Sequence, residues 1–248
     1  MKPVNAEITE VVSETPTIRT FFFDRSFGSE PGQFVMAWIR GVDEIPMALS
    51  YNNAITVQKV GSATSALFEL DKGDSIGIRG PLGKGFDRKP GHILLIAGGV
   101  GAAPLAPLAE NAASDGIKVT TLLGARTKEE LVFKKRFERA GDVIIATDDG
   151  SEGIKGYVTQ LIDNTEYFSQ IYCCGPEIMM KKVLDKILPS KAQFSLHRYI
   201  KCGLGICGAC CMDGLRVCMD GPVFSGEALK KSEFGIYRRN ECGERVKV

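Results

Sequence analysis

Histidine is scarce in this sequence, and neither sign of charge is in excess. Only two histidines occur in 248 residues, and 31 lysines and arginines balance 30 aspartates and glutamates to a formal net charge of +1. A near-neutral chain gives no electrostatic reason to expect nucleic acid or an anionic membrane surface as a partner. Because general acid–base chemistry has so little histidine to draw on, we assign no catalytic residue. Any metal site must be built almost wholly from thiolates.

A long hydrophobic run is also absent. The longest uncharged stretch, residues 93–109, is interrupted by glycine and proline and is too short for a membrane span. The first residues, MKPVNAEITEVV, lack the charged-then-apolar order of a secretory signal. We therefore expect a cytoplasmic protein that contacts no membrane.

Cysteine, in contrast, is concentrated in one place. Eight cysteines occur, and five of them lie in one short glycine-rich segment: Cys202, Cys207, Cys210, Cys211 and Cys218. A reducing compartment disfavours disulfides, so metal binding is the leading explanation. The order Cys202-x4-Cys207-x2-Cys210, with Cys218 eight positions later, is the plant-type spacing of a 2Fe–2S cluster. Interspersed glycines would let the loop wrap such a cluster and aim N–H groups at its sulfurs: Gly203, Gly205 and Gly208.

Zinc and inert thiols are the alternative interpretations of this segment. Zinc sites usually show two short Cys pairs about 15 to 20 residues apart, whereas the spacing here is asymmetric and tighter. We leave out Cys211, whose side chain should point away from its neighbouring ligand. The other three cysteines, Cys173, Cys174 and Cys242, are expected to be free thiols of a buried strand and of the chain end.

The pattern of predicted secondary structure changes near residue 91. Before it, short strand-like segments separated by turn signals, such as residues 17–24 and 33–40, predict a small antiparallel β-barrel. After it, buried strands alternate with helical patterns, which predicts a parallel α/β sheet with helices on both faces. We expect a barrel domain at 1–90, an α/β domain at 91–195 and a cluster-binding subdomain at 196–248.

Two turns of the α/β domain are candidates for binding a dinucleotide. The first follows a buried strand and precedes a helix, where glycines let a pyrophosphate approach the helix N-terminus: Gly98, Gly99 and Gly101. Its match to G-x-G-x-x-G is incomplete, and a ligand-free strand–helix turn is a comparable interpretation. The second turn, Cys174-Gly175-Pro176, ends another strand and opens toward the same sheet edge.

Several small residues of the barrel are candidates for binding a flavin: Ser50, Gly61, Thr64 and Ser65. Ordinary hairpin chemistry explains them nearly as well. A chemical need favours the flavin. A hydride carries two electrons and a 2Fe–2S cluster accepts one, and a flavin can divide the pair where no side chain can.

Together these segments resemble the ferredoxin reductase superfamily, and within it the electron-transfer subunits of NAD-linked dihydroorotate dehydrogenases. The resemblance covers nearly the whole chain and is carried by GPLGKGF (80–86), LLIAGGVGAAPL (94–105), TDDGSEGIKGYVT (147–159), CCGPEIMM (173–180) and KCGLGICGACC…RVCMDGPVF (201–224). It implies a ferredoxin-reductase-like fold, with FAD in the barrel, NAD on the α/β domain and a C-terminal 2Fe–2S cluster.

The same resemblance implies an oxidoreductase component of pyrimidine biosynthesis and the roles of its residues. Electrons would pass between the FMN of a separate catalytic subunit and NAD, in a heterotetramer of two copies of each subunit. Iron would be held by Cys202, Cys207, Cys210 and Cys218. The flavin would be held by Ser50, Gly61, Thr64 and Ser65, and the nicotinamide nucleotide by Gly98, Gly99, Gly101, Cys174, Gly175 and Pro176.

The chain departs from the family pattern at the flavin motif. The family usually has an arginine a few residues before the serine, where this chain reads Pro-Met-Ala-Leu at 46–49. Another cation, such as Arg79 or Lys59, must then face the pyrophosphate. Two rival functions stay open: a relay subunit of a ferredoxin–NADP transhydrogenase, hydrogenase or sulfite reductase, and a zinc-bearing nucleotide-binding regulator without electron transfer.

Overall fold

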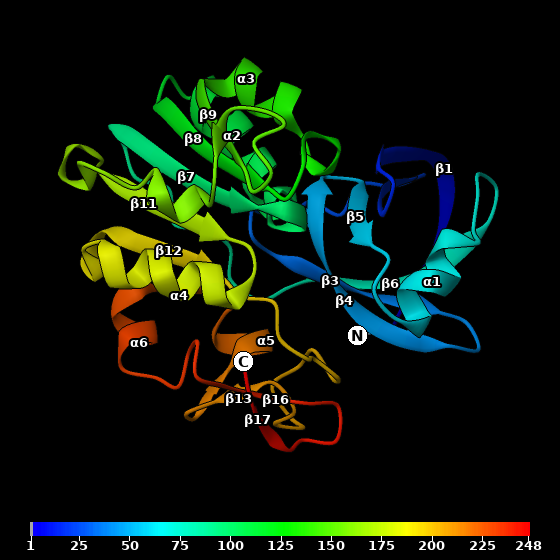
Figure 1. Ribbon diagram of the computed structural model, residues 1–248. Coiled ribbons are helices and arrows are strands. Elements are labelled where there is room, and N and C mark those ends of the chain that lie inside the picture. The colour runs from blue at the N-terminus through cyan, green and yellow to red at the C-terminus, as the bar shows by residue number, and fades with distance from the viewer. Residues whose placement is uncertain (1) are drawn as a thin grey trace.

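A computed structural model describes residues 2–248 and consists of a barrel, a parallel sheet and a C-terminal segment that lies against both. Figure 1 shows the barrel in blue and cyan, the sheet in green and yellow, and the C-terminal segment in orange and red. One apolar cluster contains residues from all three parts, among them Met36 of the barrel, Ile96 of the sheet and Cys210 of the C-terminal segment. The three parts therefore share a core.

The N-terminal part is a closed antiparallel barrel with the strand order β1-β2-β5-β4-β3-β6. Alternating residues of its strands point inward, as in β1, where Ala6 and Ile8 are buried while their neighbours are exposed. One short helix covers the barrel. Its elements are β1 (Val4–Thr15), β2 (Ile18–Phe23), β3 (Phe34–Ile39), β4 (Asp43–Tyr51), β5 (Ala54–Gln58), α1 (Ser62–Phe68) and β6 (Ser75–Leu82).

The middle part is built on a seven-stranded sheet of order β10-β9-β8-β7-β11-β12-β15, in which β15 alone is antiparallel. Alternate residues of β7 enter the two opposite cores, with Leu95 on the side of α2 and Ile96 on the side of α4. Its elements are β7 (His92–Gly98), η1 (Gly99–Gly101), α2 (Ala102–Ser114), β8 (Lys118–Ala125), η2 (Lys128–Glu130), α3 (Lys134–Ala140), β9 (Asp142–Thr147), β10 (Ile154–Lys155), η3 (Val158–Gln160), η4 (Thr165–Tyr167), β11 (Gln170–Cys174), α4 (Glu177–Lys186), η5 (Pro189–Lys191) and β12 (Ala192–Ser195).

The C-terminal part consists of short elements around the cysteine-rich loop. They are β13 (Cys211–Met212), β14 (Leu215–Arg216), α5 (Val217–Asp220), β15 (Val223–Ser225), α6 (Gly226–Lys230), β16 (Tyr237–Arg239) and β17 (Arg245–Lys247). Strand β15 leaves this part and pairs with β12 at the edge of the sheet.

The predicted fold class, an antiparallel barrel followed by a parallel α/β sheet and a C-terminal cluster segment, is confirmed. The predicted boundaries fall between β6 and β7 and directly after β12. The division into 1–90, 91–195 and 196–248 stays a prediction. Strand β15 of the third segment completes the sheet of the second.

Candidate functional site

The cysteine-rich loop has a backbone that favours glycine at three positions. Gly203, Gly205 and Gly208 have φ values of 67°, 74° and 72°. Side chains rarely adopt this left-handed region. The glycines therefore let residues 202–210 curl tightly, as the sequence predicts.

Main-chain N–H groups of this loop point at cysteine sulfurs. Leu204 donates to the Sγ of Cys202 at 3.4 Å, Gly205 to the Sγ of Cys218 at 3.2 Å, and the N–H of Cys218 to the Sγ of Cys210 at 3.4 Å. N–H groups aimed at sulfur favour the thiolate and, in an iron–sulfur site, raise the reduction potential.

The four predicted ligands approach one another as two pairs. The Cys207 side chain lies close enough to Cys202 to lower the pKa of the Cys202 thiol, and Cys210 lies close enough to Cys218 to raise the pKa of the Cys218 thiol. Within residues 2–248, no three Cys, His, Asp or Glu side chains converge as they would around one ion. Two thiol pairs are what a cluster of two irons and four thiolates requires, so the donor set fits a 2Fe–2S cluster.

The pKa values of the thiols differ across this group of cysteines. Burial by itself would raise the pKa of Cys202, but the N–H groups of Cys207, Leu204 and Ile206 together lower that pKa to about 6. Burial raises the pKa of Cys218 to about 12, and the neighbouring Cys210 adds to the rise. Four adjacent thiolates would repel one another, and a cationic iron centre removes that penalty.

The two predicted nucleotide-binding turns lie against each other. They follow β7 and β11, which are adjacent strands between which the strand order reverses, and ligands bind parallel sheets at that point. A Cβ atom built on Gly101 would lie 2.4 Å from the carbonyl oxygen of Cys174, and one on Gly98 would lie 3.1 Å from Pro176. Gly99 differs, because its Cβ would meet nothing within 4 Å.

This packing brings together all six residues predicted to bind the nicotinamide nucleotide, while their contact with a nucleotide stays a prediction. It gives Gly98 and Gly101 a structural reason to be glycine. Only Gly99 faces open space at the turn, with a φ of 54°. Cys174 is buried, and burial raises the pKa of its thiol to about 12.

The predicted flavin residues fall into two groups. The hydroxyl of the fully buried Ser50 accepts a hydrogen bond from Thr56 at 2.7 Å, and that of Thr64 accepts from the N–H groups of Val60 and Gly61 at 2.9 Å. Both hydroxyls are therefore engaged by the protein. Gly61 and Ser65, in contrast, lie at the open start of α1, and their contact with a flavin also stays a prediction.

Of the two cations considered for a flavin pyrophosphate, Lys59 is the more accessible. It is exposed, three residues before the start of α1. All three donor nitrogens of the Arg79 side chain are instead engaged, two by Glu44 and one by the main-chain carbonyl of Cys202. These bonds make Arg79 the less favoured of the two cations, and the cation that faces the pyrophosphate stays a prediction.

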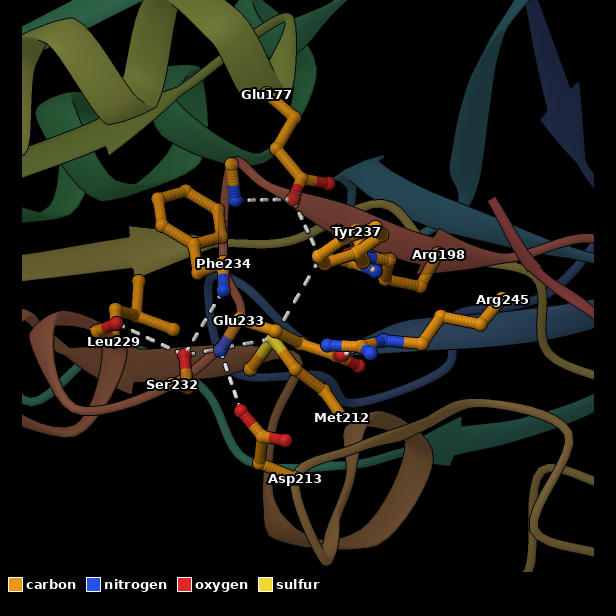
Figure 2. Close-up of polar contacts among 11 residues, drawn as sticks. Glu177, Arg198, Met212, Asp213, Leu229, Ser232, Glu233, Phe234, Tyr237 and Arg245 are labelled. Carbon is orange, nitrogen blue, oxygen red and sulfur yellow. Dashed lines mark hydrogen bonds and ion pairs between the residues drawn. The ribbon is translucent and has the colours of Figure 1, made fainter. Parts of the chain in front are cut away.

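A buried ion pair that the sequence did not indicate connects the nucleotide-binding turn to the cluster segment (Figure 2). Glu177, the residue after Pro176, accepts a 2.5 Å hydrogen bond from Arg198, whose side chain is only 4% exposed. Arg198 also donates to the carbonyl of Tyr237 at 2.9 Å and contacts the sulfur of Met212 at 3.7 Å. One guanidinium therefore holds α4, β16 and β13 together. No spacing in the sequence could pair residues 21 positions apart.

Comparison with known proteins agrees with this geometry. Residues 95–185 match the oxidoreductase NAD-binding domain family, and residues 197–230 match the iron–sulfur cluster binding domain of dihydroorotate dehydrogenase B. The chain is 57% identical to a protein of Methanocella arvoryzae named as a probable dihydroorotate dehydrogenase B (NAD(+)) electron transfer subunit, and the match covers 100% of both chains. The chain belongs to this family of electron-transfer subunits.

A second relative and a solved structure support the same family assignment. A Methanocaldococcus jannaschii protein of the same name is 48% identical over 99% of this chain and 98% of its own. Among solved structures, an NADH-dependent reduced ferredoxin–NADP oxidoreductase superposes with a TM-score of 0.83 at 32% identity, covering 92% of this chain and 90% of that one.

Membership of the electron-transfer subunit family confirms the predicted oxidoreductase class and the predicted cofactors, FAD, a 2Fe–2S cluster and NAD. In residues 2–248, no helix is both long enough and apolar enough to cross a membrane.

Proposed function

We propose that this chain carries electrons between NAD and the FMN of a dihydroorotate dehydrogenase catalytic subunit, in a heterotetramer with two copies of each subunit. The observation that carries the proposal is that the four-cysteine loop rests directly on the barrel. A Cβ on Gly203 would lie 3.1 Å from both Met36 of β3 and Leu82 of β6. The loop and the barrel are therefore close enough for a short electron path between a cluster and a flavin.

Each part of the chain then has a separate task. When bound, FAD interconverts the paired electrons of a hydride and the single electrons that a 2Fe–2S cluster carries. Cys202, Cys207, Cys210 and Cys218 hold the iron, and the N–H groups of Leu204 and Gly205 stabilise charge on the sulfurs.

The nucleotide and flavin sites are assigned to residues with free space or free charge. Gly99 leaves room for the nucleotide at the turn where the strand order reverses. Gly61, Ser65 and Lys59 surround the start of α1, where unpaired N–H groups and a positive charge suit phosphate.

The partner subunit is proposed to dock on the cluster loop. Apolar side chains around that loop are exposed, including Ile206 at 82% and Met219 at 53%. Beside the loop lies a groove of ≈ 750 Å³ whose lining includes Trp38, Val42 and Leu204. Exposed apolar surface of this kind marks interaction sites, and electron transfer requires the cluster to lie near the partner's cofactor.

Co-expression with an FMN-containing dihydroorotate dehydrogenase catalytic subunit tests the function. We expect a stable complex of two copies of each subunit, with iron, sulfide, FAD and FMN bound, that reduces NAD with dihydroorotate. Failure to co-purify would instead favour the rival relay subunits. The similarity to a ferredoxin–NADP oxidoreductase gives those rivals some support, at lower identity than the dihydroorotate dehydrogenase relatives.

Cys207→Ser separates the cluster from the other sites. We expect this variant to lose the EPR signal of the reduced 2Fe–2S centre and dihydroorotate-linked NADH formation, while flavin reduction by NADH survives. Cys242→Ser, an exposed thiol in the terminal hairpin, is the matched control and should keep all three. Equal loss of both activities in Cys207→Ser would contradict separate sites, and a colourless wild-type protein with stoichiometric zinc would favour the regulator.

A further inference from the structure

Arg79 occupies an unusual position for a charged residue, between the barrel and the cluster loop. It lies on β6, and its side chain is only 8% exposed. Its Nε and Nη2 atoms donate to the two carboxylate oxygens of Glu44 on β4 at 2.9 and 2.8 Å, and its Nη1 atom donates to the carbonyl of Cys202 at 3.0 Å. Cys202 is the first cysteine of the cluster motif.

Two features of this arrangement hold the main chain of Cys202 in place. The bidentate pair holds the guanidinium plane, because Arg and carboxylate match as two planar forks. The third donor, Nη1, then hydrogen-bonds the main-chain carbonyl of Cys202 from strand β6 of the barrel. Leu204 and Gly205, whose N–H groups point at sulfur, follow two and three residues later.

Charge is the second consequence of the pairing. A buried guanidinium or carboxylate without a partner is costly, and the two together are neutral. Each half of the pair therefore cancels the field that the other half would exert on Cys202 and its neighbours. A lysine at position 79 would keep the positive charge but could not form the bidentate pair with Glu44.

We propose that Arg79 is a positioning residue for the iron–sulfur cluster: it fastens Cys202 to the barrel and, through its pairing with Glu44, keeps the charge beside the cluster neutral. This inference rests on the proposed function, since it assumes that Cys202 ligates a 2Fe–2S centre. It goes beyond that function by assigning the setting of the cluster's potential to a pair outside the ligand loop.

The pair has two separable effects, one on the charge beside the cluster and one on the position of Cys202. Removing either charge should shift the reduction potential, in opposite directions for the two residues. Arg79→Met leaves the Glu44 carboxylate unbalanced, which disfavours adding an electron and lowers the reduction potential. Glu44→Gln leaves the guanidinium unbalanced and raises the potential. The double variant restores neutrality but still lacks the bond to Cys202.

The experiment is an EPR-monitored redox titration of the full chain with its cofactors reconstituted, for the wild type and these three variants. We expect a shift of about tenfold in the one-electron equilibrium, about 59 mV, downward for Arg79→Met and upward for Glu44→Gln. The double variant should return close to the wild-type potential. Release of iron to a chelator should be about tenfold faster in both variants that lack Arg79, and near wild type in Glu44→Gln.

Controls separate this inference from a general loss of structure. Arg40→Met removes a positive charge from an exposed site of the same barrel and should change neither the potential nor iron release. If Arg79→Met fails to fold, Glu44→Gln still tests the effect of charge and Arg79→Lys tests the bidentate geometry. We expect Arg79→Lys to keep the wild-type reduction potential of the cluster and to release iron faster.

Unchanged potentials in the charge variants, or iron release at the wild-type rate in the double variant, would overturn the inference. Neither result would affect the proposed function, which is tested separately by co-purification with the catalytic subunit and by the iron and sulfide content of the wild-type chain. Because both side chains also line the groove beside the loop, the titration uses the chain without its partner subunit.

Discussion

The guanidinium of Arg136 donates a 3.0 Å hydrogen bond to the main-chain carbonyl of Ser50, so that helix α3 of the sheet domain holds strand β4 of the barrel. The same side chain forms a bidentate pair with Glu110 of α2 and lies 3.7 Å from the ring centroid of Tyr51. Arg136 is nearly fully buried. Besides the shared core, this one side chain therefore links two domains that must present a flavin and a nicotinamide to each other.

Arg136→Met should loosen this junction. We expect a loss of about 3 kcal/mol of stability, because a hydrogen bond from a charged group, a cation–π contact and the pair with the half-exposed Glu110 disappear together. Hydride transfer from NADH to the flavin should slow, while the EPR signal of the cluster stays unchanged. Thermal unfolding and stopped-flow flavin reduction measure the two effects. Lys135→Met, an exposed change on the same helix, is the control, and an equal effect there would contradict the assignment.

The Glu177–Arg198 pair predicts a larger effect on stability. Arg198→Met leaves Glu177 as a buried carboxylate with one remaining donor, the N–H of Gly235 at 2.8 Å. Breaking a buried pair from one side costs about 3 to 5 kcal/mol. For a chain of this size we expect a melting temperature lower by about 6 to 20 °C.

Asp185→Asn is the comparison for that variant. It breaks the exposed Lys181–Asp185 pair on the same helix. Exposed pairs contribute at most about 1 kcal/mol, so its melting temperature should stay near that of the wild type. Similar losses in Asp185→Asn and Arg198→Met would mean that the buried pair has no special role.

The glycines of the nucleotide turn predict two different outcomes. Gly101→Ala places a methyl group 2.4 Å from a main-chain oxygen, so the turn cannot form and little folded protein should be obtained. Gly99→Ala meets no atom and should fold at a cost of about 1 kcal/mol for its positive φ. We expect Gly99→Ala to raise the KM for NADH at least several-fold. An unchanged KM would remove Gly99 from the nucleotide site.

Thiol reactivity follows from burial. With a pKa of about 12, only about one Cys174 thiol in ten thousand is ionised at pH 8, and a shift to pH 9 raises that fraction about tenfold. Burial also raises the pKa of Cys173. Iodoacetamide at pH 8 should therefore label the exposed Cys242 in the folded protein and leave both strand cysteines unlabelled until denaturation. Peptide mapping by mass spectrometry measures this, and rapid labelling of Cys174 would contradict its burial.

Local patterns predicted much of this protein correctly. The barrel and the parallel sheet follow from strand periodicity and from glycine-ended apolar runs, because each pattern reflects which side chains must be buried within one element. The cluster loop is equally local. Cys202, Cys207 and Cys210 span nine residues, and the intervening glycines provide the curvature that a thiol-lined loop needs.

The flavin candidates show what local patterns leave undetermined. Ser50 and Thr64 have the right chemistry for a ligand, but their hydroxyls are engaged by Thr56 and by the start of α1. A sequence gives the donors that a residue carries and not the partners that the fold supplies. The same limit applies to Arg79, one of the two cations considered for the pyrophosphate, whose side chain donates to Glu44 and to the carbonyl of Cys202.

The sequence by itself determined the order of the domains, the cysteine spacing and the position of the nucleotide turns, because these depend on residues close together in the chain. Only the tertiary structure decided that β15 completes the sheet of another segment, that Gly98 and Gly101 face a second turn, and that Arg79, Arg136 and Arg198 join separate domains. A buried guanidinium needs several acceptors in fixed directions. For these arginines the acceptors come from segments between 14 and 123 residues away, which no local spacing records.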